Sequence, residues 1–599
     1  MANTPFTGIE DPAPLIKIKL DGVDMSDSYG IQSINVHHAI NRISTAELVL
    51  MGEVDIDSGN IPITDSDDFN PGNVVEIFAG YTGGEASSIF KGVIVKHSVK
   101  LDTETHYSFA ITCKHEAVKM TYNKTERYFE KQTDDTVIKN IIGEYGISCS
   151  VGSCLEVNES MFQKLASDWD FILSRCDFNG FIITMDDNAG MVLNAPEFSD
   201  SAVLTIEAGV SLMAFEGTLN AEFQPSAVNA SAWNAKTLTL INAAATEPAM
   251  NSQGNIKARD LPSKLSQTTL NLTSATPMTT EALKTWANSI LLRKRLHAFK
   301  GRVKYFGNAL AKTGSIIEIK GAGKKLSGNA FVSAITHTID SGNWNTTVDF
   351  GLDNNLIYKS RDFSFPPAMG QLPAMQGLQL ATVKQIDRDP ENMHRIQLEI
   401  PSVSGTPNTT WARMAHYYAS NKSGSFFLPE VGDEVVLGFL DNDPRYPIIL
   451  GSLYNGKNTA PYTAEAKNNS KAFVTRSNMK IEFDEEKKSI SLLTPGNNSI
   501  IISDDGKSIE IKDQNSNSIH LSSDGITIDS AKDIKISAKG NIEMHATGNI
   551  KTAATADLVL QGLAVNINAQ TQLKATGTAS AEFSAAGETT IAGAMVMIN

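Results

Sequence analysis

The feature that most constrains the fold is a short paired repeat in the C-terminal part of the sequence. In AKDIKISAKGNIEMHATGNIKTAATADLVLQG (531–562), inward-type residues form pairs separated by one residue, and each pair follows the last by about eight positions. Fifteen such pairs lie between 481/483 and 596/598, with steps of nine or ten residues at first and seven or eight later. Gly, Asn, Asp or Ser fill most gaps, which is typical of very short strands joined by tight bends.

Eight residues are too few for one coil of a single-chain solenoid, which takes about 20 or more. Three identical chains together supply about 24 residues to each layer, enough to close a three-sided prism without free lateral edges. We therefore predict that residues 481–599 form an intertwined trimeric β-helix needle. An adhesin-like stalk is the alternative, although it normally carries a signal peptide and an anchor. The predicted needle core is Ile534, Ile536, Ile542, Met544, Ile550, Leu558, Leu560, Val565 and Ile567.

Upstream of the repeat, short alternating segments such as IKIKL (16–20) and VVEIFAGY (74–81) predict small antiparallel barrels or sandwiches. Helices are expected after Asp134, over SDWDFILSRCDFNG with Ser167 as its cap, and over TTEALKTWANSILLRKRLH (279–297). A polar, turn-rich stretch, GKNTAPYTAEAKNNSK (456–471), predicts a neck before the repeat.

The charge balance narrows the classes of partner. The chain has 67 Asp and Glu against 51 Lys and Arg, a net charge of -16, which disfavours nucleic acid and anionic lipid surfaces. No segment approaches the ~20 continuous apolar residues of a membrane helix, and the N-terminus lacks a basic region followed by an apolar run. We expect synthesis as a soluble cytoplasmic protein. Of the four cysteines, Cys149 and Cys154 could bridge, but ordinary thiols are the favoured interpretation.

Two motifs that resemble a zinc protease site and a phosphate-binding loop lack the residue spacing that these sites require. His115 and Glu116 lack the second histidine of a zinc protease motif, because position 119 is Lys, and we expect an ordinary surface pair. Gly321 and Gly323 in KGAGKKLSG do not match a phosphate loop and predict a basic turn.

Two further clusters resemble metal sites only loosely. DGVDMSDS, with acids at 21, 24 and 27, has no distal Glu and predicts a solvated hairpin. His520 and His545 occupy outward positions of the repeat, where solvated histidines are expected. We predict no catalytic residue, no cofactor and no metal. The competing enzyme hypothesis places a cell-wall hydrolase in residues 116–215, around Asp168 and Asp170, although these acids also suit a helix start.

Several blocks resemble one family. FFLPEVGDEVVLGFLDNDPRYPIILGSLYN (426–455), with VKQIDRDPENMHRIQLEIPS (383–402), is similar to the OB-fold domain of VgrG spike proteins and phage tail spikes. FNPGNVVEIFAGY with IFKGVIV (89–95), SDWDFILSRCDFNGF (167–181) and FVSAITHTIDSGNWNTTVDFGL (331–352) resemble the tail hub fused to such spikes. The closing AMVMIN (594–599) resembles a needle tip.

The resemblance implies a mainly β protein: a hub of two small β-barrels with an α/β insertion, an OB-fold barrel and the needle. The predicted boundaries are 1–115 for the first hub barrel, 116–200 for the insertion, 201–370 for the second hub barrel, 372–456 for the OB-fold domain, 457–480 for the neck and 481–599 for the needle.

By the same resemblance, the function is a homotrimeric central spike that adapts a six-fold inner tube to a three-fold needle and punctures the target envelope. The implied partners are the hexameric tube protein, baseplate and hub proteins, effectors and a PAAR-type tip protein. The particle reaches the extracellular space or the target cell after contraction, with transient contact with the target membrane. The predicted cap-docking tip is Ile591, Met595, Val596, Met597 and Ile598.

Overall fold

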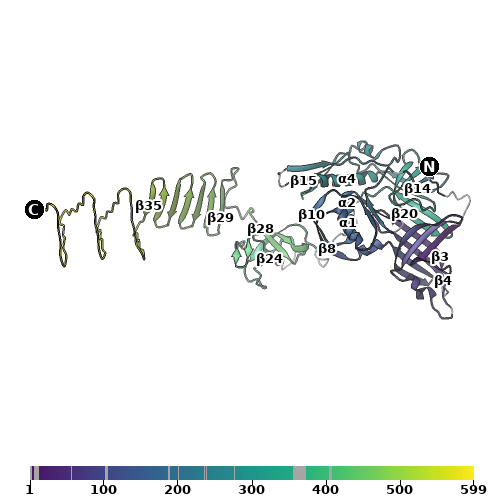
Figure 1. Ribbon diagram of the computed structural model, residues 1–599, viewed down its shortest axis with the longest axis horizontal. Coiled ribbons are helices and arrows are strands. Elements are labelled where there is room, and N and C mark those ends of the chain that lie inside the picture. The colour runs from purple at the N-terminus through teal and green to yellow at the C-terminus, as the bar shows by residue number, and fades with distance from the viewer. Residues whose placement is uncertain are drawn as a thin grey trace. The chain divides into compact units, whose positions relative to one another are not determined.

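The computed structural model describes residues 3–5, 13–55, 57–101, 105–186, 189–199, 201–234, 237, 239–274, 277–354, 373–403 and 408–598. Within these residues the protein is mainly β-stranded, as Figure 1 shows. The chain divides into two compact units, Met1–Leu453 and Tyr454–Asn599. Each unit is described by itself.

The first unit is built on one sheet of thirteen strands. Its path runs β14-β18-β21-β20-β3-β4-β7-β6-β5-β1-β2, with β19 pairing β20 and β13 pairing β19. The strands from the first part of the chain are β1 (Pro14–Leu20), β2 (Val23–Asp24), β3 (Gly30–Ala39), β4 (Thr45–Glu53), β5 (Val74–Tyr81), β6 (Ser87–Leu101) and β7 (His106–Lys114). Those from the second part are β13 (Leu204–Glu207), β14 (Leu212–Leu219), β18 (Phe299–Phe306), β19 (Ile316–Lys320), β20 (Gly328–Asp340) and β21 (Asn343–Phe350).

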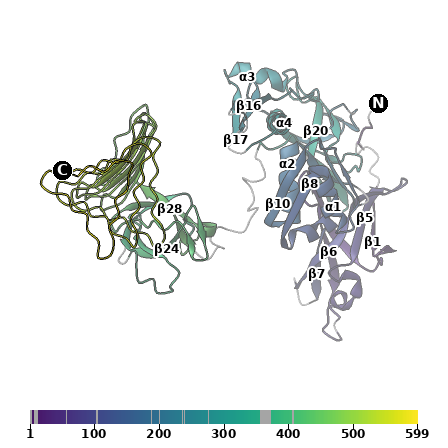
Figure 2. The ribbon, with the colours of Figure 1, turned by 60° about the vertical axis from the view of Figure 1, so that its left-hand side comes forward.

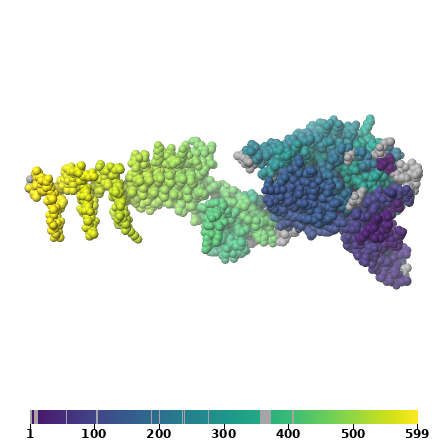
Figure 3. Space-filling view, viewed as in Figure 1, coloured from purple at the N-terminus to yellow at the C-terminus, as the bar shows by residue number. Residues whose placement is uncertain are grey.

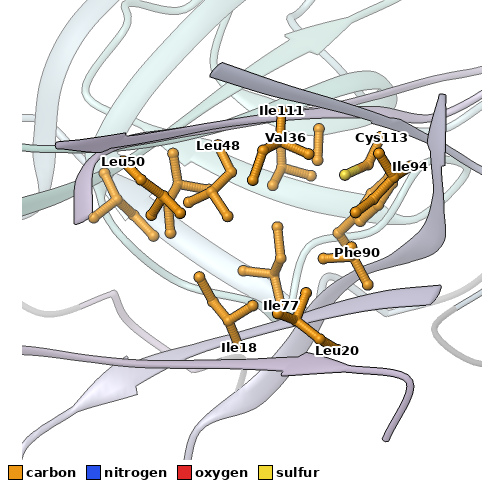
Figure 4. Close-up of a cluster of buried hydrophobic side chains, with 14 of the residues drawn as sticks. Ile18, Leu20, Val36, Leu48, Leu50, Ile77, Phe90, Ile94, Ile111 and Cys113 are labelled. Carbon is orange, nitrogen blue, oxygen red and sulfur yellow. The ribbon is translucent and has the colours of Figure 1, made fainter. Parts of the chain in front are cut away.

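Two separate cores lie along this sheet. Alternating residues of β1 and β3–β7, such as Val36, Leu48 and Ile77, pack into the first core, shown in Figure 4. The second core gathers residues of β13, β14 and β18–β21. An antiparallel ladder between β3 and β20, from Ala39↔Ala334 to Ser33↔Asp340, joins the two halves. The two predicted hub barrels thus have a core each but share one continuous sheet, because the long strand β20 pairs with both β21 and β3.

An α/β layer lies between these halves in the sequence. It contains β8 (Lys124–Thr133), α1 (Asp134–Gly143), β9 (Cys149–Val151), β10 (Val157–Ser167), α2 (Asp168–Asn179), β11 (Ile182–Met185) and β12 (Met191–Asn194). The predicted cap is confirmed: Ser167 Oγ accepts from the amide of Asp170. Gly180 ends α2 in a left-handed conformation.

A small sheet packs on the longest helix of the first unit (Figure 2). The sheet contains β15 (Val228–Asn234), β16 (Thr239–Ala244) and β17 (Leu270–Ser274), and the helix is α4 (Thr280–Leu296). A short helix, α3 (Leu261–Lys264), precedes β17. The helix predicted over 279–297 is confirmed, and Thr279 Oγ1 caps its start by accepting from the amide of Ala282.

The last part of the first unit is a closed barrel of five strands in the order β22-β23-β24-β28-β27. Its strands are β22 (Gln379–Gln385), β23 (Ile396–Glu399), β24 (Thr409–Met414), β27 (Glu434–Phe439) and β28 (Pro447–Leu453), with the hairpin β25 (Ala419–Ser420) and β26 (Ser423–Gly424) between β24 and β27. Asp443 accepts from the amide and guanidinium of Arg445, which confirms the structural turn predicted at DNDP. The predicted boundaries at 370 and 372 lie outside the described residues.

The second unit begins with an antiparallel meander of seven strands, β29 to β35, each paired with the next in sequence. They are β29 (Ser470–Val474), β30 (Lys480–Asp484), β31 (Ser489–Leu493), β32 (Ser499–Ser503), β33 (Ser508–Lys512), β34 (Ser518–Ser522) and β35 (Gly525–Asp529). From residue 530 to 598, no residue of the single chain lies in a strand. We call residues 470–529 the meander and residues 530–598 the distal segment.

Among the described residues, no helix has both the length and the apolar character needed to cross a bilayer.

Candidate functional site: an uncovered apolar ladder

One face of the meander presents two columns of apolar side chains. The strands alternate, so two residues of each strand from β30 to β35 share this face, and neighbours pair across strands without a gap. Column A is Ile481, Leu492, Ile500, Ile511, Ile519 and Ile528, and column B is Phe483, Ile490, Ile502, Ile509, Leu521 and Ile526. Eleven of the twelve are 37–71% exposed in the single chain. A contiguous apolar face of this length marks an association surface.

The opposite face of the meander is mostly polar, with Ala472, Val474, Leu493 and Ile501 as the apolar exceptions. Glu510 pairs with His520 across β33 and β34, and His520 Nδ1 lies 4.0 Å from Glu510 Oε1. His520 is therefore on the face opposite to Ile519 and Leu521, as predicted. His545, in the distal segment, is exposed and 3.6 Å from Glu543. Among the described residues, no group of three or more His, Cys, Asp or Glu is placed to hold a metal ion.

The turns of the meander repeat every nineteen residues. Left-handed backbone conformations recur at Asn478, Asn497 and Ser516 on one side, and at Lys488 and Lys507 on the other. Such positions are tolerated best by Gly, Asn and Asp, and they let the chain reverse within four or five residues. These reversals explain why the first six repeat units, most of them spaced nine or ten residues apart, pair within one chain.

Asparagine side chains connect successive turns. Asn498 Oδ1 accepts from the amide of Gln514, one hairpin further along the chain. Asn517 Oδ1 accepts from the amide of Ala531 and from Ser530 Oγ, at 3.2 and 2.7 Å. Asn517 therefore holds the first residues of the distal segment against the end of the meander.

The distal segment has a different geometry. Bends fall at 531–532, 539–540, 547–548 and 555–556, each separated by six extended residues, and the same spacing continues to 594. Figure 3 shows these residues as a thin chain without covering neighbours. All nine residues of the predicted needle core lie here and are 54–76% exposed. They share no strand ladder within the chain.

The sequence predicted one intertwined needle from residue 481 onward. The structure differs in the first six units, whose backbone groups pair within the chain, and leaves the remaining units unpaired. The tip residues Ile591, Met595, Val596, Met597 and Ile598 are 48–87% exposed, and Asn599 lies outside the described residues. Their docking role remains a prediction.

Asp168, the centre of the hydrolase alternative, is fully buried and its carboxylate is occupied by protein donors. Thr125 Oγ1 and Gln163 Nε2 donate to one oxygen, at 2.9 and 2.6 Å. Arg127 Nη2 and the Tyr145 hydroxyl donate to the other, at 2.9 and 2.8 Å. This carboxylate ties β8, β10 and the end of α1 to the start of α2. Asp170 accepts from Ser167 Oγ as part of the same helix start.

The predicted surface position of His115 is wrong. His115 is 1% exposed; its Nδ1 accepts from the amide of Ala117 and its Nε2 lies 2.9 Å from the carbonyl of Ala189. Burial lowers the pKa of this imidazole. His115 is thus a structural cap for the amide of Ala117. The local sequence did not indicate its burial, because the carbonyl of Ala189 that it contacts is distant in the chain.

The other doubtful motifs have the structural roles that the sequence predicted. Gly321 and Gly323 take left-handed conformations in the turn between β19 and β20. Asp21 lies in the β1–β2 hairpin and accepts from the amide of Val74. The four cysteines are free thiols, and burial raises the pKa of Cys154 to about 11.

Two sequence families match the chain. The profile described as the Alg8 N-terminal domain matches residues 11–341, more than half of the chain. The profile described as the type VI secretion system/phage-baseplate injector OB domain matches residues 379–454, the closed barrel.

Curated relatives match over short segments. The type VI secretion system spike protein VgrG3 of Vibrio cholerae is 36% identical over 97 residues, 15% of this chain and 10% of that protein. VgrG1a of Pseudomonas aeruginosa is 35% identical over 75 residues, 12% of each chain. The actin cross-linking toxin VgrG1 of V. cholerae is 31% identical over 98 residues, 15% of this chain and 9% of its own length. The matches therefore span about a tenth of these relatives.

Solved structures show weaker likeness. The 43 kDa tail protein of prophage MuSo2 from Shewanella oneidensis has a TM-score of 0.41 at 11% identity, covering 56% of this chain and 98% of that chain. A type VI secretion component of E. coli, c3393, has a TM-score of 0.37 at 11% identity, covering 73% of this chain and 100% of that chain. At these scores the likenesses carry no weight in the assignment.

Proposed function

Because the chain belongs to the Alg8 N-terminal domain family and is a VgrG-type spike protein, we propose that it forms the homotrimeric central spike of a contractile injection machine. The observation that carries this proposal is the uncovered apolar ladder followed by a distal segment without strand partners. In this proposal both features are completed by two further copies of the chain.

The energetics favour association. Burying a large apolar side chain contributes on the order of 1.5–3 kcal/mol, and each chain offers twelve such residues in columns A and B alone. If the apolar ladder stayed in water, this flat stack of strands would be exposed to non-specific association with other chains. Three walls that face one axis would bury all three ladders in a closed prism.

The distal segment is compatible with the same three-fold axis, but its chain passes around the axis instead of forming one wall of the prism. A bend every eight residues turns the chain from one face of the prism to the next, so one circuit takes about 24 residues. Strands stack ~4.8 Å apart, and one chain therefore rises by about three layers per circuit. Between two successive circuits of one chain there is room for two further strand layers. The other two chains fill these layers and supply the missing backbone hydrogen-bond partners.

The remaining parts of the proposal follow from the family. The two fused halves of the first unit would present two similar surfaces per chain, so that a trimer offers six to a hexameric tube and to baseplate proteins. The exposed tip would receive a PAAR-type cap, and effectors would travel with the spike. The assembled particle would leave the producing cell by contraction and puncture the target envelope. The proposed role is mechanical and needs no catalysis.

Native mass spectrometry of the purified full chain tests the central claim. The expected result is a mass three times that of the 64.6 kDa chain, stable at micromolar concentration. Electron microscopy of the same sample should show a needle extending from a broader base. A monomer at micromolar concentration would overturn the proposal.

A further inference from the structure

The two columns of the ladder have different surroundings. Column A lies beside the longer turns, 475–479, 494–498 and 513–517, and we call this edge side A. Column B lies beside the shorter turns, 485–488, 504–507 and 523–524, which form side B. Five residues of column A line a groove of about 660 Å³ whose wall is made by side A, including Thr494, Asn498 and Asn517. Column B borders a shallower hollow of about 500 Å³.

The two sides also differ in charge. Side A and its strand ends carry three cations and two carboxylates: Arg476, Lys480, Lys512, Asp513 and Asp529. Side B and its strand ends carry six carboxylates and three lysines: Asp484, Glu485, Glu486, Asp504, Asp505, Asp524, Lys487, Lys488 and Lys507. Like sides would repel at side B, whereas unlike sides attract.

We propose that column B of one copy packs into the groove over column A of the next copy, strand layer against the same strand layer. This inference rests on the proposed trimer and specifies its interface. A three-fold axis relates neighbouring copies head to tail, so each corner of the prism joins side A to side B. Charge and shape favour the same pairing of side B with side A. Side B is net acidic and borders the shallower hollow, whereas side A is more basic and borders the groove.

The axis also fixes the register. It runs along the stacking direction of the strands, and rotation about it moves no atom along it. Ile500 and Ile502 lie on the same strand, β32, one in each column. Ile500 of one copy therefore contacts Ile502 of the next, and the same holds for Ile511 and Ile509 on β33.

Disulfide cross-linking tests this register in the full chain. In the double variant Ile500→Cys/Ile502→Cys, the Cβ atoms of the two cysteines of one chain lie about 6–7 Å apart along the strand. A disulfide needs Cβ atoms roughly 3.5–4.5 Å apart, so the two cysteines of one chain cannot form one. Oxidation with diamide should therefore join different copies, and the main band on a denaturing, non-reducing gel should shift from one chain to a covalent trimer.

The matched control is Ile500→Cys/Ile511→Cys, which places both cysteines in column A on cross-strand partners of one chain. It should oxidise within the chain and run as a single chain. Each single variant should stay uncross-linked, and the unmodified protein gives the baseline of its four native thiols.

The outcomes separate the two claims. Covalent dimers from Ile500→Cys alone, or no cross-link in a double variant whose native mass is trimeric, would overturn the register while the trimer stands. A monomeric unmodified protein would overturn the proposed function itself. If Ile500→Cys/Ile502→Cys does not fold, Ile509→Cys/Ile511→Cys tests the same register one strand along.

Discussion

The meander and the distal segment both repeat a pair of inward-type residues, but they differ in whether their backbone groups form hydrogen bonds within the chain. In the meander, each strand bonds to its neighbours in the same chain, and only the apolar face lacks a partner. In the distal segment, residues 530–598 lie in no strand ladder and the inward-type apolar side chains are exposed. The difference lies in the connections: turns that reverse the chain in the first case, most of them four or five residues long, and bends of one or two residues that do not reverse it in the second. Whether the chain reverses after each pair therefore decides whether a wall is built by one chain or, in the proposed trimer, by three.

The largest expected effect is on the distal segment. Substituting Asp for Ile542 places three carboxylates around one axis of the proposed trimer, at a cost of several kcal/mol for each buried charge. We expect the distal segment to lose resistance to proteinase K while the meander keeps it, which mass mapping of the resistant core would show. Lys551→Asp, on an outward position, is the control and should leave the core unchanged. Equal resistance in both variants would contradict an inward Ile542.

The second prediction concerns what the meander does alone. Removing residues 531–599 should leave a trimer, because the strand ladder of the meander is complete within each chain and columns A and B remain. The truncated trimer should dissociate in sodium dodecyl sulfate at a lower temperature than the full chain, since the interchain ladder is gone. Gel mobility after heating in steps measures this difference. A truncated protein that is monomeric by native mass would show that the distal segment drives assembly.

A smaller effect is expected at the junction of the two segments. Asn517→Ala removes the acceptor for Ala531 and Ser530, at about 1 kcal/mol per lost hydrogen bond. Amide hydrogen exchange should rise in the first units of the distal segment. Asn498→Ala is the matched control, because it removes a similar turn-to-turn bond inside the meander, where strand ladders hold both sides. Similar changes near residue 531 in both variants would contradict a positioning role for Asn517.

The smallest effect is a pH dependence confined to the meander. Hydrogen bonds from the backbone amide and the side chain of Asn517, and smaller ones from Asn515, lower the pKa of the Asp513 carboxyl to about 2. Because the folded pKa lies below the ordinary value, this carboxylate stabilises the turn above about pH 4, and the contribution is lost as pH falls towards 2. Amide exchange of residues 513–517 should increase over that range relative to the distal segment. Asp513→Asn should flatten the dependence; an unchanged profile would exclude Asp513 as its source.

Much of the local structure was predictable because its signals are local. Ser167, Thr279 and Gly180 mark helix ends through hydrogen bonds and backbone conformations that involve only near neighbours. Over residues 481–528 the paired repeat predicted short strands with a shared apolar face for the same reason. The turn at Asp443 and Arg445 is equally local.

Other features were not predictable from these signals. The sequence of an inward pair is the same whether the chain reverses after it or bends towards the next face, so the meander was not predicted. The nine- or ten-residue steps and the turn residues Asn478 and Asn497 were the available signals of a reversing chain. The ladder between β3 and β20 joins segments far apart in the sequence, and no local pattern records it. A similar distance in the chain, from His115 to Ala189, hid the burial of His115. The docking role of the tip depends on another molecule, which no intrachain pattern can specify.

The stacking of the meander strands has a mechanical consequence. Their hydrogen bonds run along the stack, from β29 to β35, rather than across it. A thrust along that direction shortens these bonds and presses the apolar layers together, whereas a pull lengthens them and opens the stack one strand at a time. In the proposed trimer such a stack would be stiff under compression and weak under tension, which suits a part that is pushed once through a barrier and never has to be drawn back.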